Sequence, residues 1–259
     1  MTAVMQVTNL RVDIAGSTLL ELPALDLPAT GVTGLVGQNG SGKSTLLRIL
    51  ARQQSPSQGD VRYDGRRLSD WGEREFARRV AYLPQQTPLA AGLTARELVA
   101  LGRYPWHGAL GRFQAQDAAR VDEALVATET VGLADRFVDS LSGGERQRVW
   151  LAMLLAQNAD LLLLDEPISA LDPAHQTSVL SLIGRISRDK AVAVLVVLHD
   201  VNLAARYCDY LIALKQGRLI AAGAPADIMS SEQLSAVYDV DMGVFPNPDT
   251  DGVIAYVRT

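Results

Sequence analysis

Eight residues from Gly37 to Ser44 carry the spacing G-x-x-x-x-G-K-S, which is typical of a loop that binds phosphate. The apolar run Val32–Val36 precedes this loop, and a helical pattern follows it. Glycine lets backbone N–H groups turn inward, and the start of the helix adds its positive end. We expect Lys43 to reach the β- and γ-phosphates of a nucleotide and Ser44 to bind Mg²⁺. The residues assigned to nucleotide binding here are Gly37, Gln38, Asn39, Gly40, Ser41, Gly42, Lys43, Ser44 and Thr45. A glycine-rich surface turn is the alternative, and the flanking strand and helix favour the phosphate loop.

Two adjacent carboxylates, Asp165 and Glu166, follow the apolar run Leu161–Leu164. A buried strand that delivers Asp165 to its exposed end suits a partner for Mg²⁺ beside Ser44. Glu166 lies one residue further, where it would orient or deprotonate a water that attacks the γ-phosphate. A solvated acidic turn is the alternative interpretation, and the phosphate loop upstream favours the catalytic one.

A second anion site is predicted at Ser142–Glu145, where the pattern S-x-x-E forms a capping box at the start of a helix. Gly143 and Gly144 leave N–H groups exposed at the positive end of that helix. Two phosphate sites in one chain suggest that two copies enclose the nucleotide between them.

Short apolar runs alternate with helical patterns over the 259 residues, which predicts an α/β fold with crossover connections. Strands are expected at Met5–Ile14, Val32–Val36, Val80–Leu83, Leu161–Leu164 and Val192–Leu198. Helices are expected at Lys43–Ala51, Thr94–Leu101, Gln116–Val131, Glu145–Ala156, Pro173–Arg188, Val201–Tyr207 and Ser231–Tyr238. Residues 1–259 are interpreted as one nucleotide-binding domain, with a helical insertion at about 86–140 and a small C-terminal lobe at about 224–259.

The composition excludes several classes of protein. The net charge of −5 argues against non-specific nucleic-acid binding, and no apolar run approaches the ~20 residues of a membrane span. The single cysteine, Cys208, excludes an internal disulfide framework and is interpreted as a small buried hydrophobe.

The ordered set GQNGSGKST, LPQQ, LSGGERQR, LLLLDEP, SALD and LHD resembles the nucleotide-binding ATPase subunits of ABC transporters over essentially the whole chain. The resemblance implies a mostly parallel sheet around the phosphate loop, an antiparallel N-terminal sheet and a head-to-tail homodimer that binds ATP and Mg²⁺. It implies catalytic roles for Glu166, His199 and Gln85, and it adds Gln85 to Ser44 and Asp165 as residues around the metal. It implies that Ser142, Gly143 and Gly144 contact the γ-phosphate bound by the opposite copy. It also implies that Ser169, Ala170 and Asp172 form the loop that crosses the dimer interface, with Asp172 among the residues that bind the nucleotide.

A finer resemblance links Gly102–Gly108, LSGGERQR and SALDPAHQ to the ATPases that drive import of iron(III)–siderophore complexes, especially of the ferric hydroxamate type. Vitamin B12 and haem importers share much of this pattern and stay as alternatives. The resemblance implies an integral-membrane permease as partner, a substrate-binding protein as an indirect partner and a peripheral location on the cytoplasmic face of the inner membrane. Tyr104 and Trp106 are interpreted either as permease contacts or as internal packing.

Two positions depart from the family pattern. Ile168 replaces the usual Thr after DEP, and Ile14 stands where the family usually stacks adenine on an aromatic ring. The second departure leaves the preference between ATP and GTP open. An ABC-type ATPase that serves a macromolecular complex without a permease, and the ATPase of an exporter or lipid transporter, are rival functions. The absence of a heptad run and the room for only one nucleotide domain argue against the first of these rivals.

Overall fold

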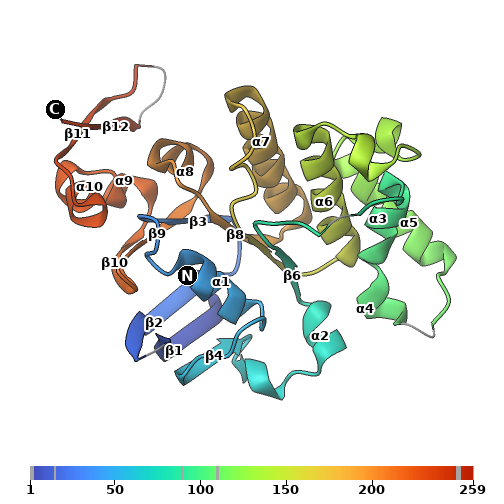
Figure 1. Cartoon of the computed structure of the whole chain (residues 1–259), viewed down its shortest axis with the longest axis horizontal. Coiled ribbons are helices and arrows are strands. Elements are labelled where there is room, and N and C mark those ends of the chain that lie inside the picture. Colours follow the sequence, from blue (N-terminus) through green and yellow to red (C-terminus); the bar gives the residue numbers. More distant parts are fainter. Residues whose placement is uncertain (1–2, 15, 89, 109–110, 249–251, 259) are drawn as a thin grey trace. The chain divides into compact units, whose positions relative to one another are not determined.

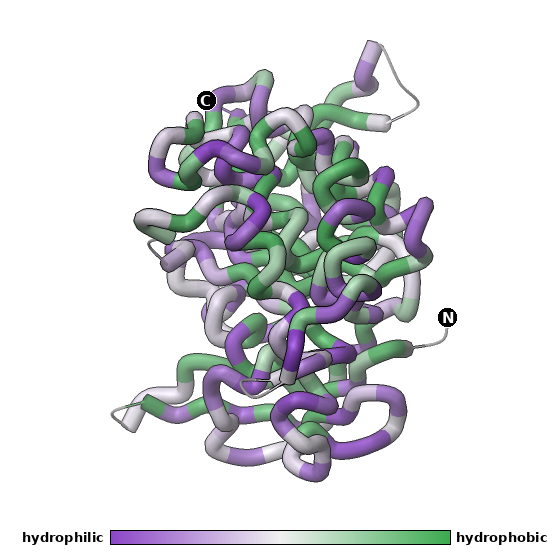
Figure 2. Tube along the Cα trace, turned by 90° about the vertical axis from the view of Figure 1, so that its right-hand side faces the viewer, coloured by the Kyte–Doolittle hydropathy of each residue, from purple (hydrophilic) through white to green (hydrophobic). Residues whose placement is uncertain are grey.

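The computed structural model describes residues 3–14, 16–88, 90–108, 111–248 and 252–258. The chain divides into two compact units (Figure 1). The first comprises Met1–Asp70 and Ala193–Thr259, and the second comprises Trp71–Val192. Hydrophobic and hydrophilic stretches alternate along the trace (Figure 2).

Parallel strands form the centre of the first unit. Strand β3 (Val32–Val36) pairs in parallel with β8 (Ala193–Val197) on one side and with β9 (Tyr210–Lys215) on the other. Strand β10 (Arg218–Gly223) continues the sheet antiparallel to β9. Every residue of β3 and β8 is buried, as expected for parallel strands covered on both faces. Helix α1 (Lys43–Leu50) follows β3 through the glycine-rich loop.

The expected antiparallel N-terminal sheet is present in the first unit. Strands β1 (Ala3–Ile14), β2 (Ser17–Pro28), β4 (Gln58–Tyr63) and β5 (Arg66–Arg67) pair in the order β2-β1-β4-β5. The alternation of the sequence buries one face, on which Leu10 of β1 lies opposite Leu22 of β2. Leu68–Asp70 forms a 3₁₀ turn after this sheet.

Short elements of the C-terminal region pack on α8 (Val201–Tyr207). They are α9 (Pro225–Ile228), α10 (Ser231–Tyr238), β11 (Met242–Pro246) and β12 (Val253–Val257). Strands β11 and β12 form an antiparallel hairpin. One apolar cluster joins these elements to α8 through Val201, Met229, Leu234, Met242 and Ala255.

The second unit contains two parallel strands and most of the helices. Strand β6 (Val80–Leu83) pairs with β7 (Leu161–Leu164), and all four residues of β7 are buried. The helices are α2 (Glu73–Ala77), α3 (Ala95–Leu101), α4 (Tyr104–His107), α5 (Ala115–Ala127), α6 (Gly143–Gln157) and α7 (Pro173–Lys190). Helices α3, α5 and α6 pack against one another. Val131–Leu133 and Val138–Ser140 are 3₁₀ turns.

Helix α5 is shorter than the sequence pattern predicts. It ends at Ala127 instead of reaching Val131. The hydroxyl of Thr128 bonds to the carbonyl of Ala124, and Glu129 adopts a φ of +58°, a left-handed conformation that a helix interior does not accept. Across the described ranges, no helix combines the length and the apolar character that a membrane crossing requires.

Candidate nucleotide site

The glycine-rich loop has a backbone that only glycine adopts without strain. Gly37, Gly40 and Gly42 have φ values of +141°, +77° and +97°. A Cβ on Gly37 would lie 2.0 Å from the carbonyl oxygen of Leu214, whereas a Cβ on Gly40 would meet nothing within 4 Å. The loop is therefore packed against β9 on one side and open at its tip. The strand, loop and helix predicted from the sequence are all present.

The donor groups around this loop suit an anion. No side chain caps the start of α1, and its first turn contains no acidic residue, so its positive end is not neutralised locally. Lys43 is 5% exposed, and its ammonium donates hydrogen bonds to the carbonyls of Gly37 (2.8 Å) and Gln38 (2.9 Å). The buried hydroxyl of Ser41 has no hydrogen-bond partner within the part of the chain that the structure describes. A phosphate group fits this donor set.

His199 lies at the same sheet edge as the loop. Strands β3 and β8 run parallel with Leu35 opposite Val197, and the N–H of Leu198 bonds to the carbonyl of Leu35. The carboxyl ends of the two strands therefore meet, which places exposed His199 after β8 beside the loop that follows β3. Asp200 then caps α8 by accepting from the N–H groups of Asn202 and Leu203.

In the second unit, Glu166, the predicted catalytic carboxylate, accepts a hydrogen bond from Gln85, the predicted loop glutamine. Strands β6 and β7 pair with Leu83 opposite Leu164, so Gln85 and Glu166 emerge at one edge. The amide of Gln85 donates to Glu166 Oε2 at 2.6 Å. Glu166 holds a φ of +51°, a left-handed conformation that costs an ordinary side chain energy. The sequence indicated both residues separately and gave no sign of this contact.

Asp165 is buried immediately before Glu166, and its N–H bonds to the carbonyl of Leu83. No group of three or more His, Cys, Asp or Glu side chains able to hold a metal occurs in the described ranges. A divalent ion bound here would take part of its oxygen ligands from the phosphates, as Mg²⁺ does in nucleotide sites.

Ser142 and Glu145 form the predicted capping box at the start of α6. The Ser142 hydroxyl accepts from the N–H of Glu145, and Glu145 Oε2 accepts from the Ser142 N–H at 2.9 Å. The hydrogen bonds that the Ser142 N–H and then the Ser142 hydroxyl donate to this carboxylate lower the pKa of Glu145. The cap leaves Gly143 and Gly144 in the first turn, where their N–H groups have no intrahelical acceptor.

His175 contacts two of the predicted site residues, a contact that the sequence reasoning missed. Asp172 caps α7 by accepting from the N–H of His175 (2.9 Å), and it also bonds the His175 ring nitrogen Nδ1 (2.7 Å). These bonds, the backbone one first, lower the pKa of the Asp172 carboxyl. A Cβ on Gly144 would lie 2.4 Å from the His175 ring, and a Cβ on Gly143 would lie 3.5 Å from the side chain of Leu171. The Ser142–Gly144 and Ser169–Asp172 segments therefore lie side by side, with His175 between them.

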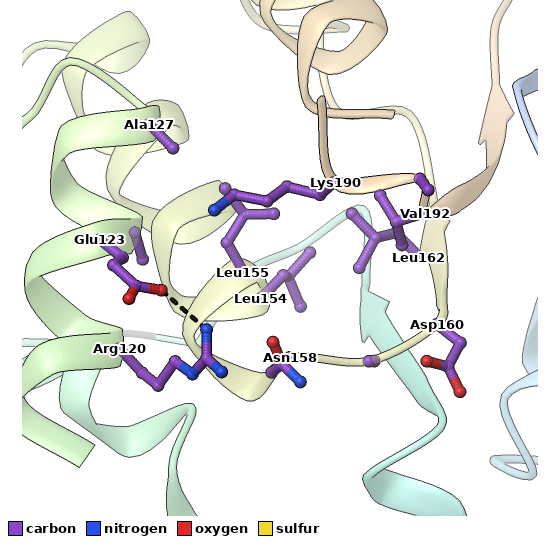
Figure 3. A pocket seen from close by; sticks show the side chains of 13 residues that line it. Arg120, Glu123, Ala127, Leu154, Leu155, Asn158, Asp160, Leu162, Lys190 and Val192 are labelled. Carbon is purple, nitrogen blue, oxygen red and sulfur yellow. Dashed lines mark hydrogen bonds and ion pairs between the residues drawn. The ribbon is translucent and has the colours of Figure 1, made fainter. Parts of the chain in front are cut away.

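A cavity of about 190 Å³ in the second unit lies at the C-terminal ends of α6 and α7, opposite the ends that carry Ser142 and Asp172 (Figure 3). Asn158, the C-cap of α6, and Lys190, the last residue of α7, line it together with the ion pair Arg120–Glu123. Helix α6 has 15 residues and is about 22 Å long, which separates this cavity from Ser142. None of the predicted site residues lines it.

Comparisons with known proteins identify the family to which the chain is similar. A family model described as "ABC transporter" matches residues 20–169. The ferric enterobactin transport ATP-binding protein of Escherichia coli is 41% identical over 89% of this chain and 85% of its own length. The iron(3+)-hydroxamate import ATP-binding protein of Bacillus subtilis is 39% identical over 88% and 84%. The hemin import ATP-binding protein of Streptomyces coelicolor is 46% identical over 95% and 87%. A solved putative metal-chelate type ABC transporter in an inward-facing conformation contains a chain that aligns with a TM-score of 0.86. It is 25% identical, over 100% of this chain and 98% of that one.

Proposed function

The chain belongs to the ATPases of ABC transporters, and we propose that it hydrolyses ATP to drive import of an iron(III)–siderophore complex, of the hydroxamate type, through a membrane permease. The observation that carries this proposal is similarity to ATP-binding proteins of siderophore transport along more than four fifths of both chains. Haem import is the second candidate, because the haem-import relative is 46% identical to this chain.

In the proposed mechanism, the phosphate loop holds the β- and γ-phosphates with its N–H groups and with the start of α1. Lys43 exchanges its bonds to the carbonyls of Gly37 and Gln38 for bonds to phosphate oxygens. Ser44, Gln85 and Asp165 would hold Mg²⁺, which neutralises phosphate charge when it is bound. The open tip at Gly40 leaves room for the phosphates.

Glu166 is proposed to orient and deprotonate the attacking water. Its carboxylate accepts a hydrogen bond from Gln85, which orients it, and a carboxylate held in this way can bind a water and accept its proton. His199 is proposed to contact the γ-phosphate from the strand end beside the loop. Ser142, Gly143, Gly144 and Asp172 are proposed to face the nucleotide of a second copy in a head-to-tail dimer.

The permease is proposed to dock on exposed apolar side chains of α3, α4 and the segment before α5. Leu101, Tyr104 and Phe113 are each about half exposed, and His107 packs edge-on between the rings of Tyr104 and Phe113. Exposed aromatic residues of this kind anchor protein interfaces. Such docking would place the chain on the cytoplasmic face of the inner membrane, with a substrate-binding protein as its indirect partner.

Copurification with its permease, followed by reconstitution in liposomes, tests this function. We expect ATP hydrolysis and uptake to rise with a binding protein loaded with an iron(III)–hydroxamate complex, and the Glu166→Gln variant to support neither. Stimulation by haem-loaded binding protein alone would select the second candidate. Copurification with a soluble macromolecular complex and no permease would contradict both.

A further inference from the structure

The C-terminal end of α10 is hydrogen-bonded to the phosphate loop through Gln38. The side-chain amide of Gln38 donates to the carbonyl of Tyr238, the last residue of α10. The carbonyl of the same Gln38 accepts from the Lys43 ammonium at 2.9 Å. One loop residue therefore contacts both the lysine assigned to phosphate binding and a helix 200 residues further along the chain.

A second donor holds the same helix end. The ammonium of Lys215, at the end of β9, donates to the carbonyl of Ala236 (2.7 Å) and to Asp239 Oδ1 (2.5 Å). Carbonyls in the last turn of a helix have no intrahelical donor, and a cation is favourable at this negative end. Gln38 and Lys215 supply such donors, so the end of α10 is fixed by the strand and loop that surround the nucleotide site.

The C-terminal lobe, residues 224–248 and 252–258, also packs on the segment that follows His199. Val201 of α8 belongs to its apolar cluster, and the side chain of Asn202 forms two hydrogen bonds with the backbone of Ala255 in β12. Burial, and then the charge of Asp200, raise the pKa of the Tyr238 phenol to about 12, so this side chain stays neutral against the start of α8. The lobe thus touches both nucleotide-contacting segments of the first unit.

We propose that the C-terminal lobe positions the phosphate loop through Gln38, so that nucleotide affinity and the docking of α10 are linked. The proposal rests on the nucleotide-binding role of the loop and is independent of the transported cargo. When Lys43 leaves the Gln38 carbonyl for a phosphate, the side-chain bond to Tyr238 holds Gln38 in place and keeps the loop N–H groups directed at the ligand. Linkage is reciprocal, so bound nucleotide also stabilises the docked α10.

The test measures MgADP binding by titration calorimetry on the full-length subunit. Gln38→Ala should weaken binding about fivefold, the amount that one neutral hydrogen bond contributes. Lys215→Met removes the two bonds from Lys215 to the end of α10 and none of the hydrogen bonds described for the loop, and it should weaken binding in the same direction. The double variant should lose less than the product of the two effects, because both act on one helix end. Gln6→Ala, on an exposed position of β1, is the matched control and should bind like the wild type.

Hydrogen exchange gives an independent measurement. MgADP should slow amide exchange at residues 231–239 in the wild type, and this protection should shrink in Gln38→Ala. Unchanged affinity in Gln38→Ala would overturn the proposal. The proposal would also be overturned if Lys215→Met bound MgADP with normal affinity and amide exchange at residues 231–239 were the same with and without nucleotide. Gln38 would then act only inside its loop. A wild type that binds no MgADP would instead remove the phosphate-loop assignment itself, and a different cargo in the transport assay would leave the linkage intact.

Discussion

Replacing Trp106 should destabilise the second unit, whereas replacing its neighbour Tyr104 should not. The indole N–H of Trp106 donates to the carbonyl of Gln157 at 2.7 Å, near the end of α6. The guanidinium carbons of Arg78 and Arg103 each lie 5.0 Å from the centre of its ring system. Tyr104 is 52% exposed against 37% for Trp106, and its ring contacts His107 edge-on at 6.3 Å.

The expected magnitude follows from these contacts. Trp106→Ala removes one hydrogen bond, about 1 kcal/mol, and two cation–π contacts of about 0.5–1 kcal/mol each at a partly exposed site. With the lost packing, the free energy of unfolding should fall by about 2–4 kcal/mol. Tyr104→Ala removes one ring contact at the surface and should cost less than about 1 kcal/mol. Trp106→Phe keeps a ring near the two guanidinium groups but loses the donor, so its effect should fall between these values.

Urea denaturation of the purified subunit measures the stability difference, and reconstituted transport measures docking. Tyr104→Ala should retain basal hydrolysis and lose permease-stimulated hydrolysis, because its ring is available to a partner. The argument is refuted if Trp106→Ala unfolds within about 0.5 kcal/mol of the wild type, a change usual for surface substitutions away from special contacts. It is also refuted if Tyr104→Ala proves the more destabilising of the two. Normal transport by Tyr104→Ala would remove this ring from the proposed interface.

Four further predictions concern the nucleotide site and the helical region. Lys43→Ala should stay folded and lose ATP binding, measured by calorimetry; near wild-type turnover would remove the phosphate-loop assignment. Glu166→Gln should bind ATP, hydrolyse it ~10²-fold more slowly or worse, and accumulate as a dimer on size-exclusion chromatography with MgATP; an active monomer would contradict the role of base. Burial raises the pKa of Asp117, but bonds from the Gln114 N–H and from Arg103 outweigh it and leave that pKa low. The stability that Asp117 contributes is therefore present above its unfolded pKa of about 3.9 and is lost as pH falls through the lower pKa of the folded state. In urea titrations, Asp117→Asn should lower the free energy of unfolding at pH 7 and lower it much less near pH 3. Ile14→Tyr should tighten ATP and GTP together, and a wild-type preference for ATP above about tenfold would show that another residue reads the base.

The sequence predicts the parts of the site whose signals are local. The phosphate loop, the strand ends before Asp165 and His199, and the Ser142–Glu145 cap each depend on residues within a few positions of one another. Residue type and spacing along a short segment determine such structures. Helix α5 shows the limit even there, since its apolar pattern runs past Ala127 while the Thr128 hydroxyl and the backbone of Glu129 end the helix.

Contacts between distant segments left no comparable signal. Gln85 and Glu166 are 81 residues apart, and each was predicted without the other. The packing of His175 on Gly144 was missed because a histidine two residues after the start of a helix has many ordinary explanations. Trp106 was ambiguous because an aromatic residue suits packing and docking equally, and only the partner of its N–H separates the two.

The link between Gln38 and α10 illustrates a more general limit. The acceptor is the backbone carbonyl of Tyr238, which any residue at that position would provide. The need for a donor arises instead from the end of the helix, where the last carbonyls lack partners. A sequence can indicate that α10 ends near Tyr238, but only the fold shows which donor meets that end. Here the donors come from the phosphate loop and from Lys215 of the strand beside it, so a general property of helix ends connects the C-terminal lobe to the nucleotide site.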